Sequence, residues 1–212
     1  MTWSFEDRSL YLCTPLRADL IEFVTECVHG GVDIVQLREK GSQDGPLLAA
    51  AELLGARCRE LGVPFLVNDR PDIAIASGAD GVHVGQDDLP PGVCRTLLGD
   101  QAVVGLSTHA PDELDAAMGA PVTYLSAGPV EATPTKPGRP GTGVGYASLA
   151  SARSAVPVFV TGGVTPRTIP ALAALGLRHF VVVRALTEAA DPRAAAAALR
   201  SAIDSSVTRS GR

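Results

Sequence analysis

Residues 62–70 read Gly62-Val63-Pro64-Phe65-Leu66-Val67-Asn68-Asp69-Arg70. A helical pattern stops at Gly62, a short connection without charged residues follows, and the apolar run from Phe65 then ends in a polar cluster. An apolar run without alternation is typical of a parallel strand that is covered on both faces. This stretch therefore predicts a buried strand that lies between two helices and carries functional groups at its C-terminal end.

Similar apolar or β-branched runs recur along the chain at intervals of roughly 20 to 30 residues. They are Ser9–Thr14, Ile34–Arg38, Phe65–Asn68, Gly81–Gly85, Val103–Ser107, Tyr124–Gly128, Val158–Thr161 and His179–Val183. Helical patterns lie between them, including Leu20–His29, Pro46–Leu61 and Asp112–Met118. Thr165-Pro166 and Asp191-Pro192 each have the form of an N-cap followed by proline at the first helical position.

This series of strand–helix units predicts an α/β fold, a single-domain (β/α)8 TIM barrel. We assign residues 1–204 to the barrel and 205–212 to a flexible C-terminal tail. A doubly wound sheet is the alternative, but it commonly has about five or six strands, and no G-x-G-x-x-G follows the first run here. Nearly every strand ends in a polar cluster, whereas the connections from a helix to the next strand, such as Gly31-Val32-Asp33, are short and hold no such cluster. Because barrel enzymes carry their active sites at the C-terminal ends of the strands, we expect one functional face and one structural face.

Composition limits the classes of partner. The net charge of −5 argues against nonspecific binding to nucleic acid or to an anionic membrane, although a local cluster can still bind an anionic small molecule. Residues 1–11 hold no apolar run, so we expect no signal peptide, and no stretch approaches the ~20 apolar residues of a membrane span. Cys13, Cys27, Cys58 and Cys94 form no CxxC pair, which predicts buried thiols and no zinc site. We expect a soluble cytoplasmic protein, and assembly into a homo-oligomer is left open.

Lysine is scarce, since Lys40 and Lys136 stand against sixteen arginines. Each closes a polar cluster after a strand, in Gln36-Leu37-Arg38-Glu39-Lys40 and in Thr133-Pro134-Thr135-Lys136. Lysine offers a compact ammonium where arginine offers a planar fork. A site that packs several phosphate oxygens around one small cation, beside a metal, could require lysine. The alternative is chance on a solvated loop.

Carboxylates follow two neighbouring strands. Asp69 follows the third strand, and Asp87 and Asp88 follow the fourth. Magnesium prefers oxygen ligands, usually one or two carboxylates completed by water and substrate phosphates. We choose Asp69 and Asp88 as Mg²⁺ ligands, although spacing alone does not separate Asp88 from Asp87. The alternative for each is an ion pair or a helix cap.

The remaining clusters suggest phosphate binding. Gly162-Gly163 and Val183-Arg184 follow the last two strands, where barrels often bind phosphate through backbone N–H groups; a plain tight turn is the alternative. The segment 130–143 is rich in Gly and Pro and is a candidate lid that is mobile when empty, with a disordered insertion as the alternative. Ser107 is the hydroxyl best placed for a substrate phosphate. His83 alternates with apolar residues, so we expect it to be a structural buried histidine.

In order and spacing, these clusters resemble the thiamine-phosphate synthase family over nearly the whole chain. The matching segments are Gln36–Lys40, Asn68–Arg70, Gly81–Asp88, Ser107–His109, Gly128-Pro129 with Thr133–Lys136, and Gly162-Gly163. The resemblance implies a (β/α)8 barrel that joins hydroxymethylpyrimidine pyrophosphate to thiazole phosphate with Mg²⁺, giving thiamine phosphate and pyrophosphate. It implies dissociative loss of pyrophosphate, which needs neutralised leaving-group charge and excluded water instead of a protein nucleophile.

The resemblance also implies roles for individual residues. The pyrimidine pyrophosphate would be held by Gln36, Arg38, Lys40, Asn68, Ser107 and Lys136, with Leu37 and Glu39 in the same segment. The thiazole phosphate would be held by Thr133, Thr135, Gly163 and the backbone of Val183 and Arg184, with Pro134 in the same segment as the two threonines. Arg38, Lys40, Ser107 and Lys136 would act in catalysis, and Asp69 and Asp88 would hold the metal.

One departure and two alternatives remain open. Many members of the family carry serine where this chain has Arg184, which alters thiazole phosphate binding if the hydroxyl matters. A thiazole tautomerase or regulatory relative on the same barrel is one alternative function. A non-catalytic protein that binds phosphorylated metabolites is the other.

Overall fold

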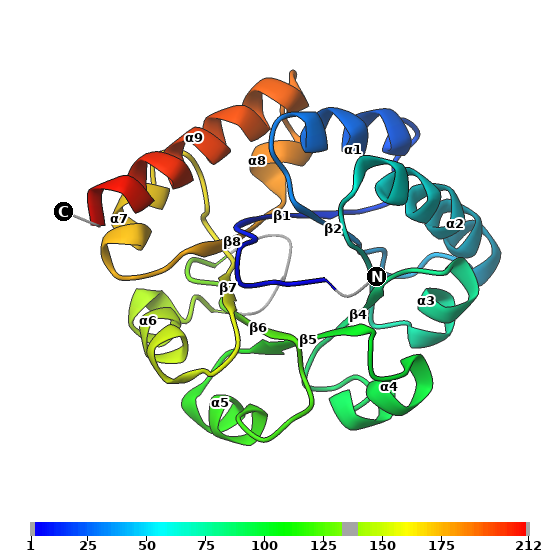
Figure 1. Ribbon diagram of the computed structural model, residues 1–212, viewed down its shortest axis with the longest axis horizontal. Coiled ribbons are helices and arrows are strands. Elements are labelled where there is room, and N and C mark those ends of the chain that lie inside the picture. The colour runs from blue at the N-terminus through cyan, green and yellow to red at the C-terminus, as the bar shows by residue number, and fades with distance from the viewer. Residues whose placement is uncertain (1–2, 133–139, 211–212) are drawn as a thin grey trace.

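The chain folds into a closed barrel of parallel strands, seen end-on in Figure 1. The computed structural model describes residues 3–132 and 140–210, without the side chains of 207–210. The strands neighbour one another in sequence order, and β8 closes the ring by pairing with β1. The helices surround this ring, so the predicted single (β/α)8 barrel is confirmed.

The strands agree with the predicted runs to within a residue or two. They are β1 Leu10–Thr14, β2 Ile34–Leu37, β3 Phe65–Asn68, β4 Gly81–Val84, β5 Val103–Thr108, β6 Tyr124–Ala127, β7 Val158–Val160 and β8 His179–Val182. The helices are α1 Leu20–His29, α2 Asp44–Leu61, α3 Pro71–Ser77, α4 Pro91–Leu98, α5 Pro111–Ala117, α6 Gly143–Arg153, α7 Ile169–Ala174, α8 Arg184–Thr187 and α9 Pro192–Ser210.

The strands β1 to β7 are buried on both faces, which explains why their sequences are apolar without alternation, whereas His179 and Val181 of β8 are only partly buried. Successive side chains of β2 point to opposite sides, as in any strand. Val35 and Leu37 join the large core between the strands and the helices. Ile34 joins a smaller cluster inside the barrel, together with Phe159 and Tyr124. The barrel interior is therefore packed at its base with side chains.

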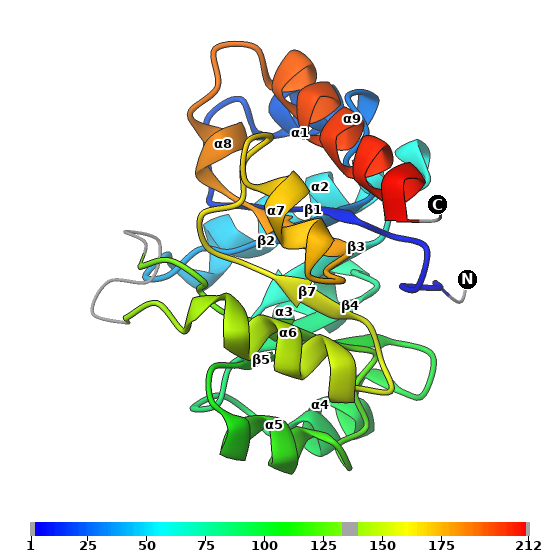
Figure 2. The ribbon, with the colours of Figure 1, turned by 90° about the vertical axis from the view of Figure 1, so that its left-hand side faces the viewer.

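The N-terminal segment closes the bottom of the barrel. In Figure 1 it crosses the ring of strands, and Figure 2 shows the N-terminus on the side opposite α8. Phe5 is buried and stacks on Tyr124 at a ring-centroid distance of 5.0 Å. The Trp3 indole donates a 2.7 Å hydrogen bond to Asp80, whose other oxygen accepts from the backbone N–H of Phe65 at 2.9 Å. Aromatic packing and a satisfied carboxylate thus tie the first residues to the base.

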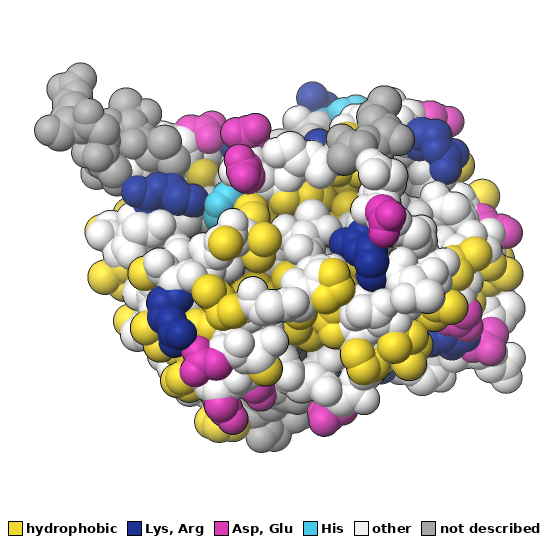
Figure 3. Space-filling model, turned by 60° about the horizontal axis from the view of Figure 1, so that its bottom comes forward, with side chains coloured by type: hydrophobic (Ala, Val, Ile, Leu, Met, Phe, Trp, Pro, Cys, Tyr) yellow, Lys and Arg dark blue, Asp and Glu magenta, His cyan; other side chains and the backbone are white. Residues whose placement is uncertain are grey.

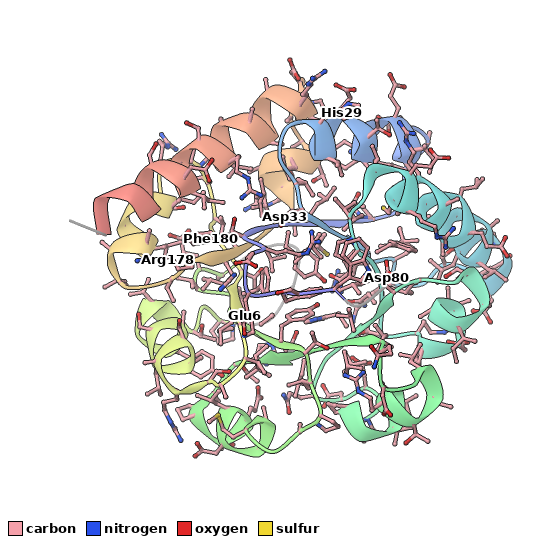
Figure 4. All side chains as sticks on the ribbon, in the orientation of Figure 1. Glu6, His29, Asp33, Asp80, Arg178 and Phe180 are labelled. Carbon is pink, nitrogen blue, oxygen red and sulfur yellow. The ribbon has the colours of Figure 1, made fainter. Side chains whose placement is uncertain are left out.

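A second carboxylate organises the same face. Figure 4 labels Asp33 and Asp80, which lie where the chain enters β2 and β4. Asp33 accepts backbone hydrogen bonds from Ser9 and Leu10, and its carboxylate lies 2.6 Å from the guanidinium of Arg200. Arg200 also donates to the Gly31 carbonyl. These contacts fix the N-terminal ends of strands, as expected for a structural face.

The last helix differs from the expected tail. We placed the end of the barrel at residue 204, but α9 continues to Ser210. Its buried side chains Ala196, Leu199, Ile203 and Ser206 are spaced three or four residues apart, so the packed face extends past residue 204. Residues 205–210 are therefore helical.

Of the two expected proline-containing helix starts, one is confirmed and one is shifted. Asp191 accepts from the backbone N–H of Ala194 at 2.9 Å and caps α9, which begins at Pro192. α7 begins at Ile169 rather than at Pro166, because Thr165 and Thr168 exchange side-chain-to-backbone hydrogen bonds that hold a turn between them. The wrong start reflects competition between hydroxyl and backbone for the same N–H groups.

The outer surface carries mixed side chains. On the face drawn in Figure 3, hydrophobic groups are scattered among charged and polar ones. No helix in the described part of the chain combines the length and the apolar character needed to cross a bilayer.

Candidate active site

A cavity of about 560 Å³ opens at the C-terminal ends of the strands. Most of the site residues predicted from the sequence line it, and they come from six different strand ends. These residues are Gln36, Arg38, Lys40, Asn68, Asp69, Asp88, Ser107, Gly163, Val183 and Arg184. The polar clusters after successive strands thus meet in one space, as expected of a barrel enzyme.

The end of β2 and the segment after it contribute alternate residues to the cavity. Gln36 is buried and its amide donates to Asn68 Oδ1 at 3.4 Å. Arg38 and Lys40 follow on the same side and line the cavity wall. Leu37 instead packs in the outer core, and the Glu39 carboxylate accepts a 3.0 Å hydrogen bond from the backbone N–H of Leu16. Glu39 therefore anchors the loop after β1.

Asp69 and Asp88 lie side by side in the cavity. Burial raises the pKa of Asp69, and the adjacent Asp88 carboxyl raises it further, while Lys40 opposes both effects. Asp69 has a φ of 60°, which is uncommon outside glycine, and its ammonium neighbour Lys40 lies 3.3 Å away. Asp88 also accepts from the Gly85 N–H at 2.8 Å. A backbone conformation that L-residues seldom adopt thus directs one carboxylate at another.

The pair fits a hard divalent cation. Burial and the neighbouring Asp88 carboxyl raise the pKa of Asp69, so a cation that takes the place of its proton would stabilise the carboxylate. Among the residues that the structure describes, no three His, Cys, Asp or Glu side chains gather at metal-binding distance. Mg²⁺ needs only one or two carboxylates when substrate phosphates and water complete the octahedron. Asp87 lines the same cavity, but it is Asp88 that contacts Asp69.

The loops after β7 and β8 form the opposite rim. Gly163 has a φ of 74°, and a Cβ there would lie 2.6 Å from the Glu131 carboxylate, so the position requires glycine. The Thr168 hydroxyl donates to the Gly163 carbonyl at 2.8 Å and fixes the loop. Val183 and Arg184 face it from the start of α8. This rim offers backbone groups and one guanidinium to a phosphate.

Two arginines in the cavity are available to an anion. Arg38 and Arg184 line the wall, and within the described residues neither forms an ion pair or a side-chain hydrogen bond. Several arginines outside the cavity, by contrast, are held by carboxylates or carbonyl oxygens, as in the pairs of Arg70 with Asp44 and Asp72. These two guanidinium groups are therefore placed to bind the phosphate groups of a ligand.

Sequence reasoning missed part of the cavity. Tyr11 and Cys13 from β1 and Ser126 from β6 also line it, and their spacing of two along β1 was the signal that both side chains face the barrel interior. His83, expected to be structural, is buried but also lines the cavity and lies 2.8 Å from the Ser107 hydroxyl.

Part of the predicted site falls outside the described residues. It comprises Thr133, Pro134, Thr135 and Lys136, which also belong to the candidate lid.

Comparisons with known proteins agree with this arrangement. A family model described as thiamine monophosphate synthase matches residues 10–186. The thiamine-phosphate synthase of Mycobacterium tuberculosis is 46% identical over 208 residues, covering 92% of this chain and 94% of that protein. That of Saccharopolyspora erythraea is 47% identical over 206 residues and covers 92% of each. Among solved structures, a thiamine phosphate pyrophosphorylase from Pyrococcus furiosus has a TM-score of 0.84 at 27% identity, covering 93% of this chain and 96% of that one.

Proposed function

Because this chain belongs to the thiamine monophosphate synthase family, we propose that its cavity joins 4-amino-2-methyl-5-hydroxymethylpyrimidine pyrophosphate to 4-methyl-5-(2-phosphoethyl)thiazole. Its activity is that of a thiamine-phosphate synthase, a transferase that forms thiamine phosphate and releases pyrophosphate. Both partners are small molecules, and the proposal includes no nucleic acid or membrane and places the reaction in the cytoplasm.

The reaction proceeds by loss of the leaving group before the new bond forms. The bond between the pyrimidine methylene carbon and the pyrophosphate oxygen breaks, and its electron pair leaves with the pyrophosphate. The thiazole nitrogen then donates its lone pair to the resulting pyrimidine-methyl cation. Neither step requires a protein nucleophile or a strong base, so catalysis rests on charge stabilisation and positioning.

The cavity supplies both requirements. Arg38 and Lys40 would neutralise the growing negative charge on the pyrophosphate, and Gln36 and Asn68 would orient the pyrimidine beneath it. Mg²⁺, held by Asp69 and Asp88, would supply further charge neutralisation at the phosphate oxygens. Gly163, Val183 and Arg184 would hold the thiazole phosphate on the opposite rim, which points the thiazole nitrogen toward the reacting carbon.

One observation supports this function over its alternatives. The paired carboxylates Asp69 and Asp88 face the cavity beside Lys40 and Arg38. A pyrophosphate leaving group with a divalent cation needs such a set, whereas a thiazole tautomerase handles no pyrophosphate. A protein that only binds a phosphate without a metal gains nothing from two carboxylates next to its anion, because they repel it.

Pyrophosphate release tests the proposal. The protein is mixed with both substrates and Mg²⁺, and pyrophosphate and thiamine phosphate are measured together. We expect equal amounts of the two products, formed only when both substrates are present, and loss of both on chelation of the metal. Binding of the substrates to folded protein without either product would reject the synthase assignment and favour a binding protein.

A further inference from the structure

A buried chain of hydrogen bonds runs through the barrel interior and ends at the cavity. The hydroxyls of Tyr11 and Tyr124 lie 2.8 Å apart, and Tyr124 lies 2.8 Å from Nδ1 of His83. The other ring nitrogen of His83, Nε2, lies 2.8 Å from the Ser107 hydroxyl. Four side chains from β1, β6, β4 and β5 are thus linked in series, and three of them, Tyr11, His83 and Ser107, line the cavity.

The hydrogen bonds of this series can all point in either of two directions. In one, Tyr11 donates to Tyr124, Tyr124 donates to Nδ1 of His83, and Nε2–H donates to Ser107. In the other, Ser107 donates to Nε2, Nδ1–H donates to Tyr124, and Tyr124 donates to Tyr11. The two directions correspond to the two neutral tautomers of His83.

Burial favours the first direction. In the second, the Tyr11 hydroxyl hydrogen has no acceptor in the described part of the chain, and a buried unsatisfied donor is destabilising by about 1–3 kcal/mol. In the first, the hydroxyls of Tyr11 and Tyr124 and the Nε2–H of His83 each have an acceptor within the series. Burial also raises the pKa of Tyr124, so its hydroxyl keeps the hydrogen that it donates to Nδ1 of His83 in this direction.

The surrounding packing is shaped to hold this chain. The His83 ring stacks on Tyr124 with centroids 5.5 Å apart and planes 24° apart. Gly105 is paired with His83 in the sheet, and a Cβ at Gly105 would overlap the Tyr124 ring and lie 2.6 Å from His83 Nδ1. A larger residue at this place in β5 would push the rings apart. The missing side chain of Gly105 is therefore what allows the contact.

We propose that Tyr124 and His83 are positioning residues that fix His83 as its Nε2–H tautomer and turn the Ser107 hydroxyl hydrogen into the cavity. Ser107 then acts as a hydrogen-bond donor to an acceptor atom of the pyrimidine pyrophosphate. If Ser107 donated to His83 instead, it would present only lone pairs to that atom and would repel it. This inference rests on the proposed function for the identity of the acceptor, but the tautomer itself does not.

The tautomer can be measured directly in the wild-type protein without substrates. In protein labelled with ¹⁵N-histidine, Nδ1 of His83 should resonate as an unprotonated nitrogen and Nε2 as a protonated one at pH 8. The chain has four histidines, so the signal is assigned by its absence in His83→Gln and by single removal of the other three. A protonated Nδ1, in the neutral ring or in an imidazolium, overturns the proposal.

Two matched variants then separate positioning from general stability. Tyr124→Phe removes one hydroxyl and keeps the aromatic packing, and it should give a mixture of His83 tautomers. It should lower kcat/KM for the pyrimidine substrate about tenfold while KM for thiazole phosphate stays within about twofold. Tyr146→Phe, the same change in a buried tyrosine of α6, should alter neither the spectrum nor the kinetics.

The outcomes also separate this inference from the proposed function. An unchanged tautomer and unchanged kcat/KM in Tyr124→Phe reject the positioning role even if the enzyme is active. If the wild-type protein makes no thiamine phosphate, the proposed function fails, while the ¹⁵N spectrum still accepts or rejects the tautomer.

Discussion

The ammonium of Lys40 lies 3.3 Å from a carboxylate oxygen of Asp69, and both groups face the cavity. Burial raises the pKa of this carboxylate, and its contact with Asp88 raises the pKa further. In the ligand-free protein the lysine therefore offsets part of the repulsion between two acids. A cation bound to the carboxylates would relieve the lysine of this task and leave it available to a phosphate.

Removing either carboxylate should abolish turnover without unfolding the protein. Asp69→Asn and Asp88→Asn each leave one metal ligand, so pyrophosphate release should fall at least 100-fold at ordinary Mg²⁺ concentrations. Because burial and Asp88 raise the pKa of Asp69, its ionised form destabilises the fold, and thermal unfolding of Asp69→Asn should not shift downward. Asp72→Asn, an exposed aspartate of α3, is the control. Normal Mg²⁺ dependence in both cavity variants would contradict the assignment.

Replacing the cavity lysine by arginine should be harmful even though the charge is kept. The guanidinium of Lys40→Arg is broader and planar and cannot occupy the place of an ammonium 3.3 Å from Asp69. We expect kcat/KM for the pyrimidine substrate to fall at least tenfold, with the same result for Lys136→Arg. Arg57→Lys on α2, outside the cavity, should have no effect. Wild-type rates in both lysine variants would mean that the scarcity of lysine is a coincidence.

Arg184 should strengthen binding of thiazole phosphate without acting on the chemistry. Its guanidinium lines the cavity beside the Gly163 loop, so Arg184→Ser should raise KM for thiazole phosphate about three- to tenfold at low salt with little change in kcat. The difference should shrink as ionic strength rises, because salt screens exposed charges. Arg193→Ser on α9 is the matched control. A large loss of kcat in Arg184→Ser would show that the guanidinium acts in the transition state.

Two of the cysteines should resist alkylation in the folded protein. Burial raises the pKa of both the Cys27 and the Cys58 thiol to about 12, so the reactive thiolate is rare at pH 8. Mass spectrometry after brief iodoacetamide treatment should find these two unmodified in buffer and fully modified in urea. The raised pKa values also predict lower stability at high pH. Because these thiols ionise more easily in the unfolded protein, the free energy of unfolding should fall as pH rises from about 9 toward 12. Rapid labelling of Cys58 in buffer would show that its helix opens locally.

The base of the barrel should contribute stability and leave activity unaffected. Arg200 binds the Gly31 carbonyl, the Ser9 hydroxyl and the Asp33 carboxylate. Arg200→Ala should therefore lower the free energy of unfolding by about 1–3 kcal/mol, measured by urea denaturation. Its kcat and KM at 25 °C should match those of the wild-type protein. A selective loss of activity with unchanged stability would contradict the division into two faces.

The sequence was sufficient for the barrel and for most of the polar wall. Apolar runs ending in polar clusters are local features, and the rule that strand ends converge places Asp69 beside Asp88 without any knowledge of distances. Side-chain direction was the feature that the sequence predicted least well. Leu37 and Glu39 lie next to binding residues in sequence but point elsewhere, and the two-residue period of a strand would have excluded Leu37.

Other features depend on how distant strands come together. The link from Tyr11 to Ser107 joins β1, β6, β4 and β5, and the relative heights of non-neighbouring strands follow from closure of the ring. The start of α7 depends on which of two threonines captures the free N–H groups. Neither the alignment of distant strands nor the choice between the two threonines follows from residue types alone.

The aromatic side chains packed at the base close the barrel at one end. With Trp3 and Phe5 filling the lower end, the described residues leave the mouth at the strand tips as the route for traffic in both directions. Gln36 and Asn68 lie deep and buried, whereas Arg184 is exposed at the rim. Whatever occupies the rim therefore stands in the exit of whatever lies below. Under the proposed function, the pyrimidine substrate held near Gln36 and Asn68 would therefore have to enter before the thiazole phosphate occupies the rim.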